Sequence, residues 1–268
     1  DCPDACSLAV TVTDGRITRV DAGPANPFTD GWICAKVRQH AKRVYSPDRV
    51  LTPLVRTGPK GTGAFRPATW DEALALIGDR MREAIDSLAG PASIVGYTYN
   101  SSAAVVEKAS LTDAFFAAVG ATSAEHTICA ATASAAWGSV FGAMASADPT
   151  DVVHAKLIVI WGANPTVSNT HFPPLVTRAV AEGATLVVID PRRTAMARRA
   201  HHHLAVRPGT DAVLALAIAN RWAEQGRINR AFTDVHATGV EELLAAAAEW
   251  PVARAAEVCG VDAAAIEA

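Results

Sequence analysis

The sequence predicts an α/β protein in which a small β-rich lobe precedes a region built on a parallel sheet. Near the N-terminus, Asp14-Gly15 separates two runs of β-forming residues, a pattern typical of a type I′ hairpin. From about residue 69, apolar strands alternate with helices, as in βαβ units whose parallel strands are covered on both faces. The expected boundaries are 1–56 for the lobe, 57–150 for a first α/β region and 151–268 for a second.

Length and composition are those of an ordinary globular protein. The 268 residues are 50% hydrophobic and 19% charged, which is enough for a substantial core. A net charge of −3 gives no attraction to nucleic acid or to an anionic membrane. No apolar run reaches the length of about 18 residues that a membrane-spanning helix needs. We therefore expect no nucleic-acid partner and no direct membrane span.

The β-rich lobe is expected to hold the hairpin and one further extended segment. The hairpin strands are predicted over 8–13 and 16–20. Residues 51–56 form an edge segment, because Pro53 has no N–H to give to a central ladder. Gly and Pro residues over 57–68 then predict a surface loop.

The first α/β region is expected to begin with a helix over 70–88. Thr69 followed by Glu72 is a capping-box pattern, in which the two side chains satisfy free N–H groups at the start of a helix. The elements predicted next are a strand over 93–97, a helix ending near 119, a strand over 123–128 and a Gly/Ala-rich stretch to 147.

The second α/β region contains three apolar strands alternating with helices. The strands are predicted over 156–161, 185–190 and 203–206, and the helices over 173–182, 211–225 and, with short breaks, 230–268. This order predicts a Rossmann-like parallel sheet. In such sheets ligands bind beyond the carboxyl ends of the strands, so the chemistry is expected there.

The first two strand ends carry residues suited to parts of a nucleotide. Gly162 lets the backbone approach a phosphate, and Asn164 both donates and accepts hydrogen bonds. Asp190 suits a ribose diol, and the guanidinium of Arg192 suits a phosphate.

The third strand end is Gly209-Thr210-Asp211. It presents a helix N-terminus suited to an anion and a carboxylate whose two oxygens suit the paired N–H donors of guanine. An ordinary helix N-cap explains the same three residues. The chain contains neither Gly-x-Gly-x-x-Gly nor a P-loop, so it lacks the fingerprint of nicotinamide, flavin or P-loop nucleotide sites.

Three of the five cysteines, Cys2, Cys6 and Cys34, lie near the N-terminus. Two close thiolates and one distant one suit a cubane iron–sulfur cluster, in which each of four irons takes one Cys ligand. The predicted hairpin returns Cys34 towards the first two thiolates. We expect the fourth ligand to be a Cys just upstream of Asp1 that is lost from this chain. A structural zinc site is the alternative, although zinc sites favour pairs of cysteines with two residues between them.

With the expected upstream cysteine, the spacing is Cys-x2-Cys-x3-Cys-x27-Cys-x-Lys, which resembles the start of the molybdopterin oxidoreductases of the DMSO reductase type. The passage over 45–54 and the three strand ends resemble the same family. The resemblance implies a 4Fe-4S cluster beside molybdenum or tungsten held by two molybdopterin guanine dinucleotides. It also implies that one dinucleotide contacts the strand-end residues Trp161, Gly162, Asn164, Asp190, Arg192, Gly209, Thr210 and Asp211.

Four further residues receive roles from the resemblance. Cys129, 32 residues before Trp161, falls where the family has its protein ligand to the metal; a small buried hydrophobic residue is the alternative. Lys36 falls between cluster and pterin and would relay electrons, with a solvated surface lysine as the alternative. Asn100 and Glu125 fall where relatives contact the cofactor.

Other residues receive no role. Consecutive His residues over 201–203 alternate faces in a strand and cannot converge on one metal ion. Cys259 lies outside every motif and is interpreted as a buried residue. His126 and His171 lie near the expected pocket, but we assign neither a role in proton transfer.

The resemblance spans the whole chain, but family members are several hundred residues longer, so the chain resembles an N-terminal portion. It implies two-electron redox chemistry on a small-molecule substrate, commonly with oxygen-atom or sulfur transfer. Electrons would pass through the cluster to a redox partner protein or subunit. Ala130 disfavours formate, because that branch has His beside its metal ligand, and Cys129 disfavours the sulfoxide and amine-oxide reductases, which use Ser. Nitrate, polysulfide and thiosulfate stay open.

Two alternatives to this function remain from the sequence. One is a non-catalytic electron-transfer or structural subunit resembling the large subunit of complex I. The other is a nucleotide-binding α/β protein with a zinc–thiolate site. For the compartment, the cytoplasm is preferred to the periplasm.

Overall fold

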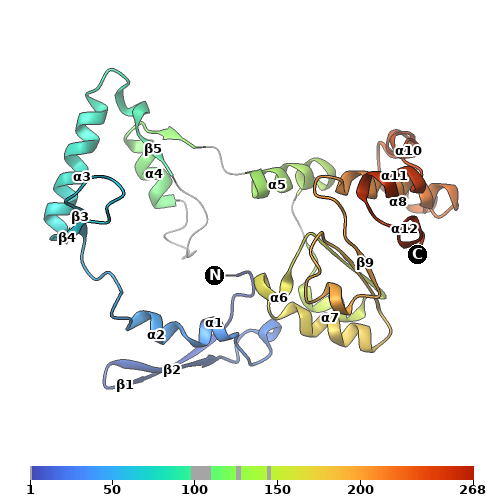
Figure 1. Ribbon diagram of the computed structural model, residues 1–268, viewed down its shortest axis with the longest axis horizontal. Coiled ribbons are helices and arrows are strands. Elements are labelled where there is room, and N and C mark those ends of the chain that lie inside the picture. The colour runs from blue at the N-terminus through green and yellow to red at the C-terminus, as the bar shows by residue number, and fades with distance from the viewer. Residues whose placement is uncertain (1, 98–109, 125–127, 144–145) are drawn as a thin grey trace. The chain divides into compact units, whose positions relative to one another are not determined.

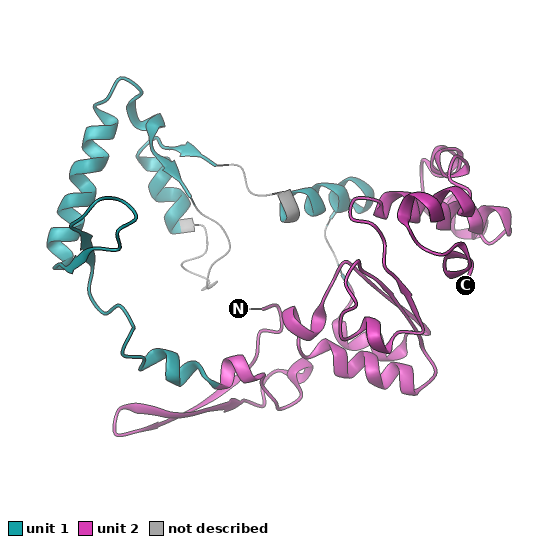
Figure 2. Ribbon diagram, viewed as in Figure 1, with its two compact units in different colours: residues 1, 39–146 teal, residues 2–38, 147–268 magenta. Residues whose placement is uncertain are grey.

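The computed structural model describes residues 2–97, 110–124, 128–143 and 146–268 (Figure 1). The chain divides into two compact units, shown in different colours in Figure 2. One unit comprises Gln39–Ser146, and the other joins Cys2–Arg38 to Ala147–Ala268. The cysteines at the N-terminus therefore fold with the C-terminal half of the chain. Within the described ranges, no helix is long and apolar enough to span a membrane.

The predicted hairpin at the N-terminus is confirmed. Strands β1 (Leu8–Thr13) and β2 (Arg16–Ala22) pair antiparallel. Asp14 and Gly15 have φ angles of 49° and 74°, so both central residues of the turn are left-handed, as a type I′ turn requires. The hairpin is followed by the 3₁₀ turn η1 (Pro27–Thr29) and by helix α1 (Ala35–Arg38).

The unit of Gln39–Ser146 begins with α2 (His40–Val44) and a small antiparallel sheet. Strand β3 (Leu54–Arg56), within the predicted edge segment, pairs with β4 (Phe65–Pro67). The prediction of a loop over 57–68 is therefore wrong for its last residues. A two-stranded sheet consists only of edge strands, so Pro67 is tolerated there.

Helix α3 (Trp70–Ile85) starts where the sequence predicts. The Thr69 hydroxyl accepts a hydrogen bond from the Glu72 N–H at 3.1 Å, as in a capping box. The carboxylate of Glu72 forms an ion pair with Arg66 of β4. That pairing, through a side-chain hydrogen bond, lowers the pKa of Glu72. Glu72 thus ties the helix to the small sheet.

The remaining elements of this unit are short. After η2 (Gly90–Ser93), strand β5 (Val95–Gly96) pairs parallel with β6 (Thr122–Ser123). The helices are α4 (Ser110–Ala118) and α5 (Ile128–Phe141). The strand predicted over 123–128 is thus shorter than expected, because Ile128 already begins a helix.

The second unit contains the predicted parallel sheet. Strands β7 (Leu157–Trp161), β8 (Thr185–Ile189) and β9 (His202–Leu204) pair in the order β7-β8-β9. The connecting elements are η3 (Pro149–His154), α6 (Pro165–Ser168), α7 (Phe172–Ala181) and η4 (Ala197–Arg199). The C-terminal helices are α8 (Asp211–Glu224), α9 (Arg230–His236), α10 (Val240–Ala248), α11 (Val252–Cys259) and α12 (Ala263–Glu267).

The core of this unit lies on two sides of β8. On one side, Leu186 and Val188 pack with Val176 of α7. On the other side, Ile189 packs with Leu214 of α8 and with Cys259. Strand β8 is therefore covered on both faces, as predicted, because its side chains alternate between the two clusters.

Strand β7 differs from that prediction. Its inward residues Ile158 and Ile160 are buried, whereas Leu157, Val159 and Trp161 are 57%, 47% and 37% exposed. The C-terminal helices pack on one another and near β9, so within the described residues they leave this face of the edge strand open. The expectation that the sheet is covered on both faces is wrong for β7.

Leu214→Ala is expected to lower the free energy of unfolding by about 2–5 kcal/mol, because Leu214 is fully buried and its loss leaves a cavity. The measurement is urea unfolding of the full-length protein, followed by tryptophan fluorescence. Leu243→Ala is the control, since Leu243 is 51% exposed, and its effect should stay within about 0.5 kcal/mol. Equal effects of the two substitutions would contradict the described core.

Candidate functional site

The three N-terminal cysteines, Cys2, Cys6 and Cys34, are all free and partly buried in the second unit. Burial raises the pKa of the Cys6 thiol, and the nearby charges of Asp4, Cys2 and Cys34 raise it further. The three thiols therefore lie within electrostatic range of one another. Bound irons would offset the mutual repulsion of the thiolates.

These thiols are not arranged around a single ion. Within the described ranges, no group of three or more His, Cys, Asp or Glu side chains is placed to hold one metal ion. A cubane cluster takes one thiolate on each of its irons, so its ligands stand around a body larger than one ion. Three partly buried thiols are the donor set that an iron–sulfur cluster uses.

Lys36 lies in helix α1, which begins directly after Cys34, the third cysteine. Its Nζ donates a hydrogen bond to the carbonyl of Val167 at 3.0 Å. Val167 belongs to α6, which follows the end of β7. The contact therefore links the cysteine-bearing segment to the first strand end.

The first strand end presents open backbone. Gly162 has a φ of 59°, and its N–H donates to the carbonyl of Ile189 at 2.8 Å. A Cβ added at Gly162 would meet no atom within 4 Å, so there is space in front of this loop. The Asn164 side chain accepts from the Thr166 hydroxyl at 2.7 Å, which holds its amide in place at the start of α6.

The second strand end is held by its own backbone. Asp190 is 9% exposed, and its Oδ1 accepts from the N–H of Arg192 at 2.7 Å. Nε2 of His203 donates to the Asp190 carbonyl at 2.9 Å. The Arg192 side chain is exposed, as a phosphate-binding guanidinium requires.

The third strand end turns sharply into α8. Gly209 has a φ of 85°, and a Cβ there would also meet open space. The Thr210 hydroxyl donates to the Arg207 carbonyl at 2.7 Å, which closes the turn. Trp161 Nε1 donates to Asp211 Oδ1 at 2.6 Å, so the structure brings the first and third strand ends together. Sequence reasoning did not foresee this contact, which occupies one of the two oxygens considered for guanine.

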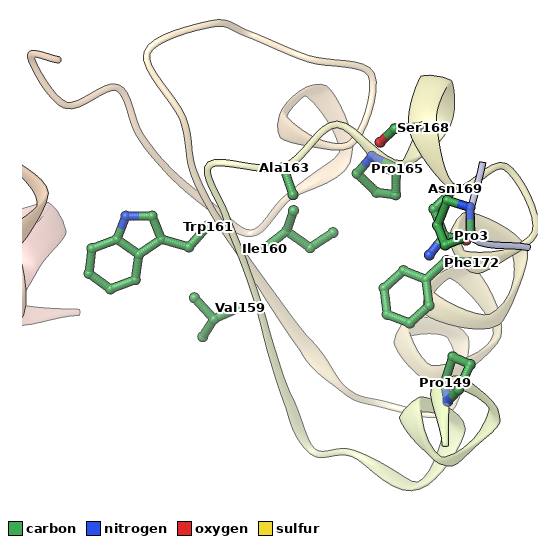
Figure 3. Close-up of a pocket in the computed structure, with 10 residues that line it drawn as sticks. All are labelled: Pro3, Pro149, Val159, Ile160, Trp161, Ala163, Pro165, Ser168, Asn169 and Phe172. Atoms are coloured by element: carbon green, nitrogen blue, oxygen red, sulfur yellow. The ribbon is translucent and has the colours of Figure 1, made fainter. Parts of the chain in front are cut away.

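A pocket of about 560 Å³ lies beside the first strand end (Figure 3). Oδ1 of Asn169, which lines it, is buried without a hydrogen-bond partner among the described residues. Such an acceptor suits a ligand that brings a donor. Because Pro3 also lines the pocket, the pocket lies between the cysteine segment and the end of β7. Its lining residues are Pro3, Pro149, Val159, Ile160, Trp161, Ala163, Pro165, Ser168, Asn169 and Phe172.

The structure brings together Asp4, Trp32 and His171; sequence reasoning missed the first two and gave His171 no role. Asp4 and His171 are 1% and 2% exposed and hydrogen-bonded to each other. The available signal was the carboxylate of Asp4 between two candidate ligands, in Cys2-Pro-Asp-Ala-Cys6. Its partner is 167 residues away, which no local pattern reveals.

The predicted metal ligand and the two predicted cofactor contacts of the other unit are only partly described. Cys129 lies in the first turn of α5, but its side chain is outside the described part of the structure. Asn100 and Glu125 lie outside the described residues altogether. Cys259 is fully buried in the core, as interpreted from the sequence. Directly before β9, Nδ1 of His201 accepts from the N–H of Leu186 at 2.9 Å, so this nitrogen is already engaged by the backbone.

Comparison with known proteins identifies the family. Residues 49–245 match the molybdopterin oxidoreductase family, and residues 1–46 match the molybdopterin oxidoreductase Fe4S4 domain. The chain belongs to the molybdopterin oxidoreductase family. The expected cofactors follow from this membership: a 4Fe-4S cluster and molybdenum or tungsten with molybdopterin.

Individual relatives agree with the family assignment. The chain is 34% identical over 261 residues to the probable oxidoreductase YoaE of Bacillus subtilis, covering 97% of this chain and 38% of YoaE. It is 28% identical over 261 residues to the dimethyl sulfoxide reductase DmsA of Haemophilus influenzae, covering 90% and 32%. Acetylene hydratase from Pelobacter acetylenicus has a similar structure, with a TM-score of 0.78 and 28% identity over 97% of this chain and 36% of the hydratase. The chain thus spans between 32% and 38% of the length of these relatives.

Gly209→Ala is expected to destabilise the protein by about 1–2 kcal/mol, because the open space around Gly209 leaves only the left-handed backbone as a source of strain. Thermal unfolding of the full-length protein measures it. The matched control is Gly138→Ala in α5, where a Cβ also meets open space but φ is ordinary. That change should stabilise by about 0.5–1 kcal/mol. If both substitutions stabilised the protein, the turn at Gly209 would be described wrongly.

Proposed function

We propose that this chain is the cluster-binding and dinucleotide-binding portion of a molybdenum or tungsten oxidoreductase that holds two molybdopterin guanine dinucleotides. The observation that carries the proposal is the hydrogen bond from Lys36 Nζ to the Val167 carbonyl. It ties the segment with the three cysteines to the loop after β7. An electron carrier and a redox cofactor held by these two segments would be close neighbours.

In this proposal Cys2, Cys6 and Cys34 each ligate one iron of the cluster, and a further ligand completes it. Their partial burial supports the role, since a cluster needs both a protected site and a short path to the cofactor. The Lys36 amine would carry its positive charge between two anionic groups, the cluster and the pterin. The exposed ammonium has a fixed hydrogen bond at α6, which supports a positioned cation over a freely solvated one.

The strand ends would hold one guanine dinucleotide. Open space in front of Gly162 and Gly209 supports close approach of phosphates to backbone. Asp190, fixed by the Arg192 N–H, would accept from the ribose, and the exposed Arg192 guanidinium would pair with a phosphate. The oxygen of Asp211 that Trp161 does not engage would accept from the guanine edge.

Cys129 would ligate the metal, and Asn100 and Glu125 would contact the cofactor. The bound metal supplies two-electron exchange with a small substrate, commonly with oxygen-atom or sulfur transfer. The polypeptide positions this group and tunes it. The position of Cys129 in the sequence supports the role, because it lies 32 residues before Trp161, where the family has its protein ligand to the metal.

Electrons would leave through the cluster to a partner protein or subunit. Two relatives support this partner, because their names describe a dimethyl sulfoxide reductase chain and an F420-dependent formate dehydrogenase subunit alpha. Relatives act on formate, dimethyl sulfoxide and nitrate by name. Because Ala130 replaces the histidine of the formate branch, we propose an oxygen- or sulfur-transfer substrate.

Metal and pterin analysis of the full-length protein, purified without oxygen, tests the proposal. About four irons, molybdenum or tungsten near one per chain, and a guanine-containing pterin are expected. Iron without molybdenum, tungsten or pterin would instead indicate an electron-transfer subunit and contradict the proposed catalysis.

Cys129→Ala is expected to reduce turnover at least about a hundredfold and to change the spectroscopic signal of the metal, because it removes the proposed protein ligand. Iron content should stay unchanged, since Cys129 is not a proposed cluster ligand. The matched control is Ser139→Ala, which removes an exposed hydroxyl from the same helix and should leave both signals as in the wild type. Retention of activity and of the metal signal in the Cys129 variant would remove Cys129 from the site.

A further inference from the structure

Asp4 and His171 form a buried hydrogen-bonded pair beside the candidate cluster ligands. Asp4 Oδ2 lies 2.6 Å from His171 Nδ1. The same oxygen accepts from the His171 backbone N–H at 3.1 Å and from the Thr170 hydroxyl at 3.3 Å. One carboxylate oxygen therefore receives three contacts from the start of α7.

The other side of the His171 ring is held equally closely. Nε2 lies 3.0 Å from the carbonyl of Trp32, and since a carbonyl only accepts, Nε2 carries a hydrogen. The Trp32 and His171 rings lie with their centroids 3.9 Å apart and their planes tilted by 32°. Trp32 is two residues before Cys34, so His171 contacts the chain beside both groups of cysteine ligands.

The backbone around Asp4 is fixed from a third direction. Asn26 Nδ2 donates to the carbonyls of Asp4 at 3.1 Å and Ala5 at 2.9 Å. Ala5 has a φ of 47°, a left-handed conformation that an alanine adopts only at a cost. Such strain persists where the surroundings impose it, and it clusters at functional sites.

Stability of the fold alone does not account for this arrangement. Burying a carboxyl group and an imidazole removes both from water, and a well-packed apolar pair of similar size is often as stable or more stable. Moreover, Asp4 Oδ1 is buried without a hydrogen-bond partner among the described residues. Asp4 lies two residues from Cys2 and from Cys6, so the way its side chain is held affects a cluster bound by these cysteines.

We propose that Asp4, His171 and Trp32 form a clasp that positions the cysteine segment on the start of α7 and helps to set the reduction potential of the cluster. The inference rests on the proposed function, since it requires the cluster on Cys2, Cys6 and Cys34. Reduction adds negative charge to a cluster, so a nearby carboxylate opposes it, and the hydrogen bonds from Thr170 and His171 to that carboxylate weaken its effect. Potentials of iron–sulfur clusters depend on net charge and hydrogen bonding in this way.

The test is a redox titration of the cluster in the full-length enzyme, followed by electron paramagnetic resonance. Asp4→Asn keeps the shape of the side chain and an acceptor for the His171 N–H, so it is expected to fold. It should raise the midpoint potential, because a neutral amide replaces the carboxylate while His171 stays. His171→Phe keeps a ring against Trp32 but leaves Asp4 without its partner, so it should lower the potential. A purely structural role would not produce shifts of opposite sign.

A second readout follows the positioning role. Release of iron to a chelator should be about tenfold faster or more in His171→Phe, because hydrogen bonds that hold the cluster segment are lost. Asp4→Asn retains part of these bonds and should lie between this variant and the wild type. The control is His201→Phe, which removes a histidine of the same unit whose Nδ1 accepts from the Leu186 N–H in β8. It should match the wild type.

Opposite shifts of potential with faster iron release would support the clasp. Potentials and release rates equal to those of His201→Phe in both variants would overturn it. If the wild-type protein contained no iron, the proposed function would be contradicted and not the clasp alone, so the two failures are distinguishable.

Discussion

The attachment of the N-terminal cysteine segment to residues 165–172 is the contact on which the rest of the site depends. Lys36 donates a hydrogen bond to α6. His171, at the start of α7, contacts Asp4, between the first two cysteines, and Trp32, just before the third. Without these bonds the cysteines would belong to a separate hairpin. With them, residues more than 130 positions apart form one compact unit that presents both thiolates and strand ends.

The same region explains why the strand ends are available for a ligand. Strand β7 buries Ile158 and Ile160 against α7, and its loop then leaves the sheet at Gly162, with open space in front. The Trp161 indole N–H donates a hydrogen bond to Asp211, which links the first and third strand ends. A pocket lined by Pro3 and Asn169 lies between the cysteine segment and this edge. Rigid backbone around open space is what a long, charged cofactor requires.

Local patterns were sufficient for most of the fold and for the family. The Asp14-Gly15 turn, the Thr69 cap and the three parallel strands depend on neighbouring residues. The turn and the cap lie where the sequence predicts them, and the strands lie within two residues of their predicted bounds. The long-range contacts were not predictable, because Asp4–His171 and Trp161–Asp211 join side chains that no periodicity connects. The exposure of one face of β7 was not predicted, because a continuous apolar run predicts a buried strand whether or not a helix covers that face in the fold.

An experimental structure of the loaded, full-length enzyme, prepared without oxygen, tests the central claim most directly. We expect a cubane cluster on Cys2, Cys6 and Cys34, with a guanine dinucleotide across the carboxyl ends of β7 and β8 and the turn at Gly209. The Lys36 amine is expected between cluster and pterin. A cluster held by other residues, or a dinucleotide away from these strand ends, would contradict the account.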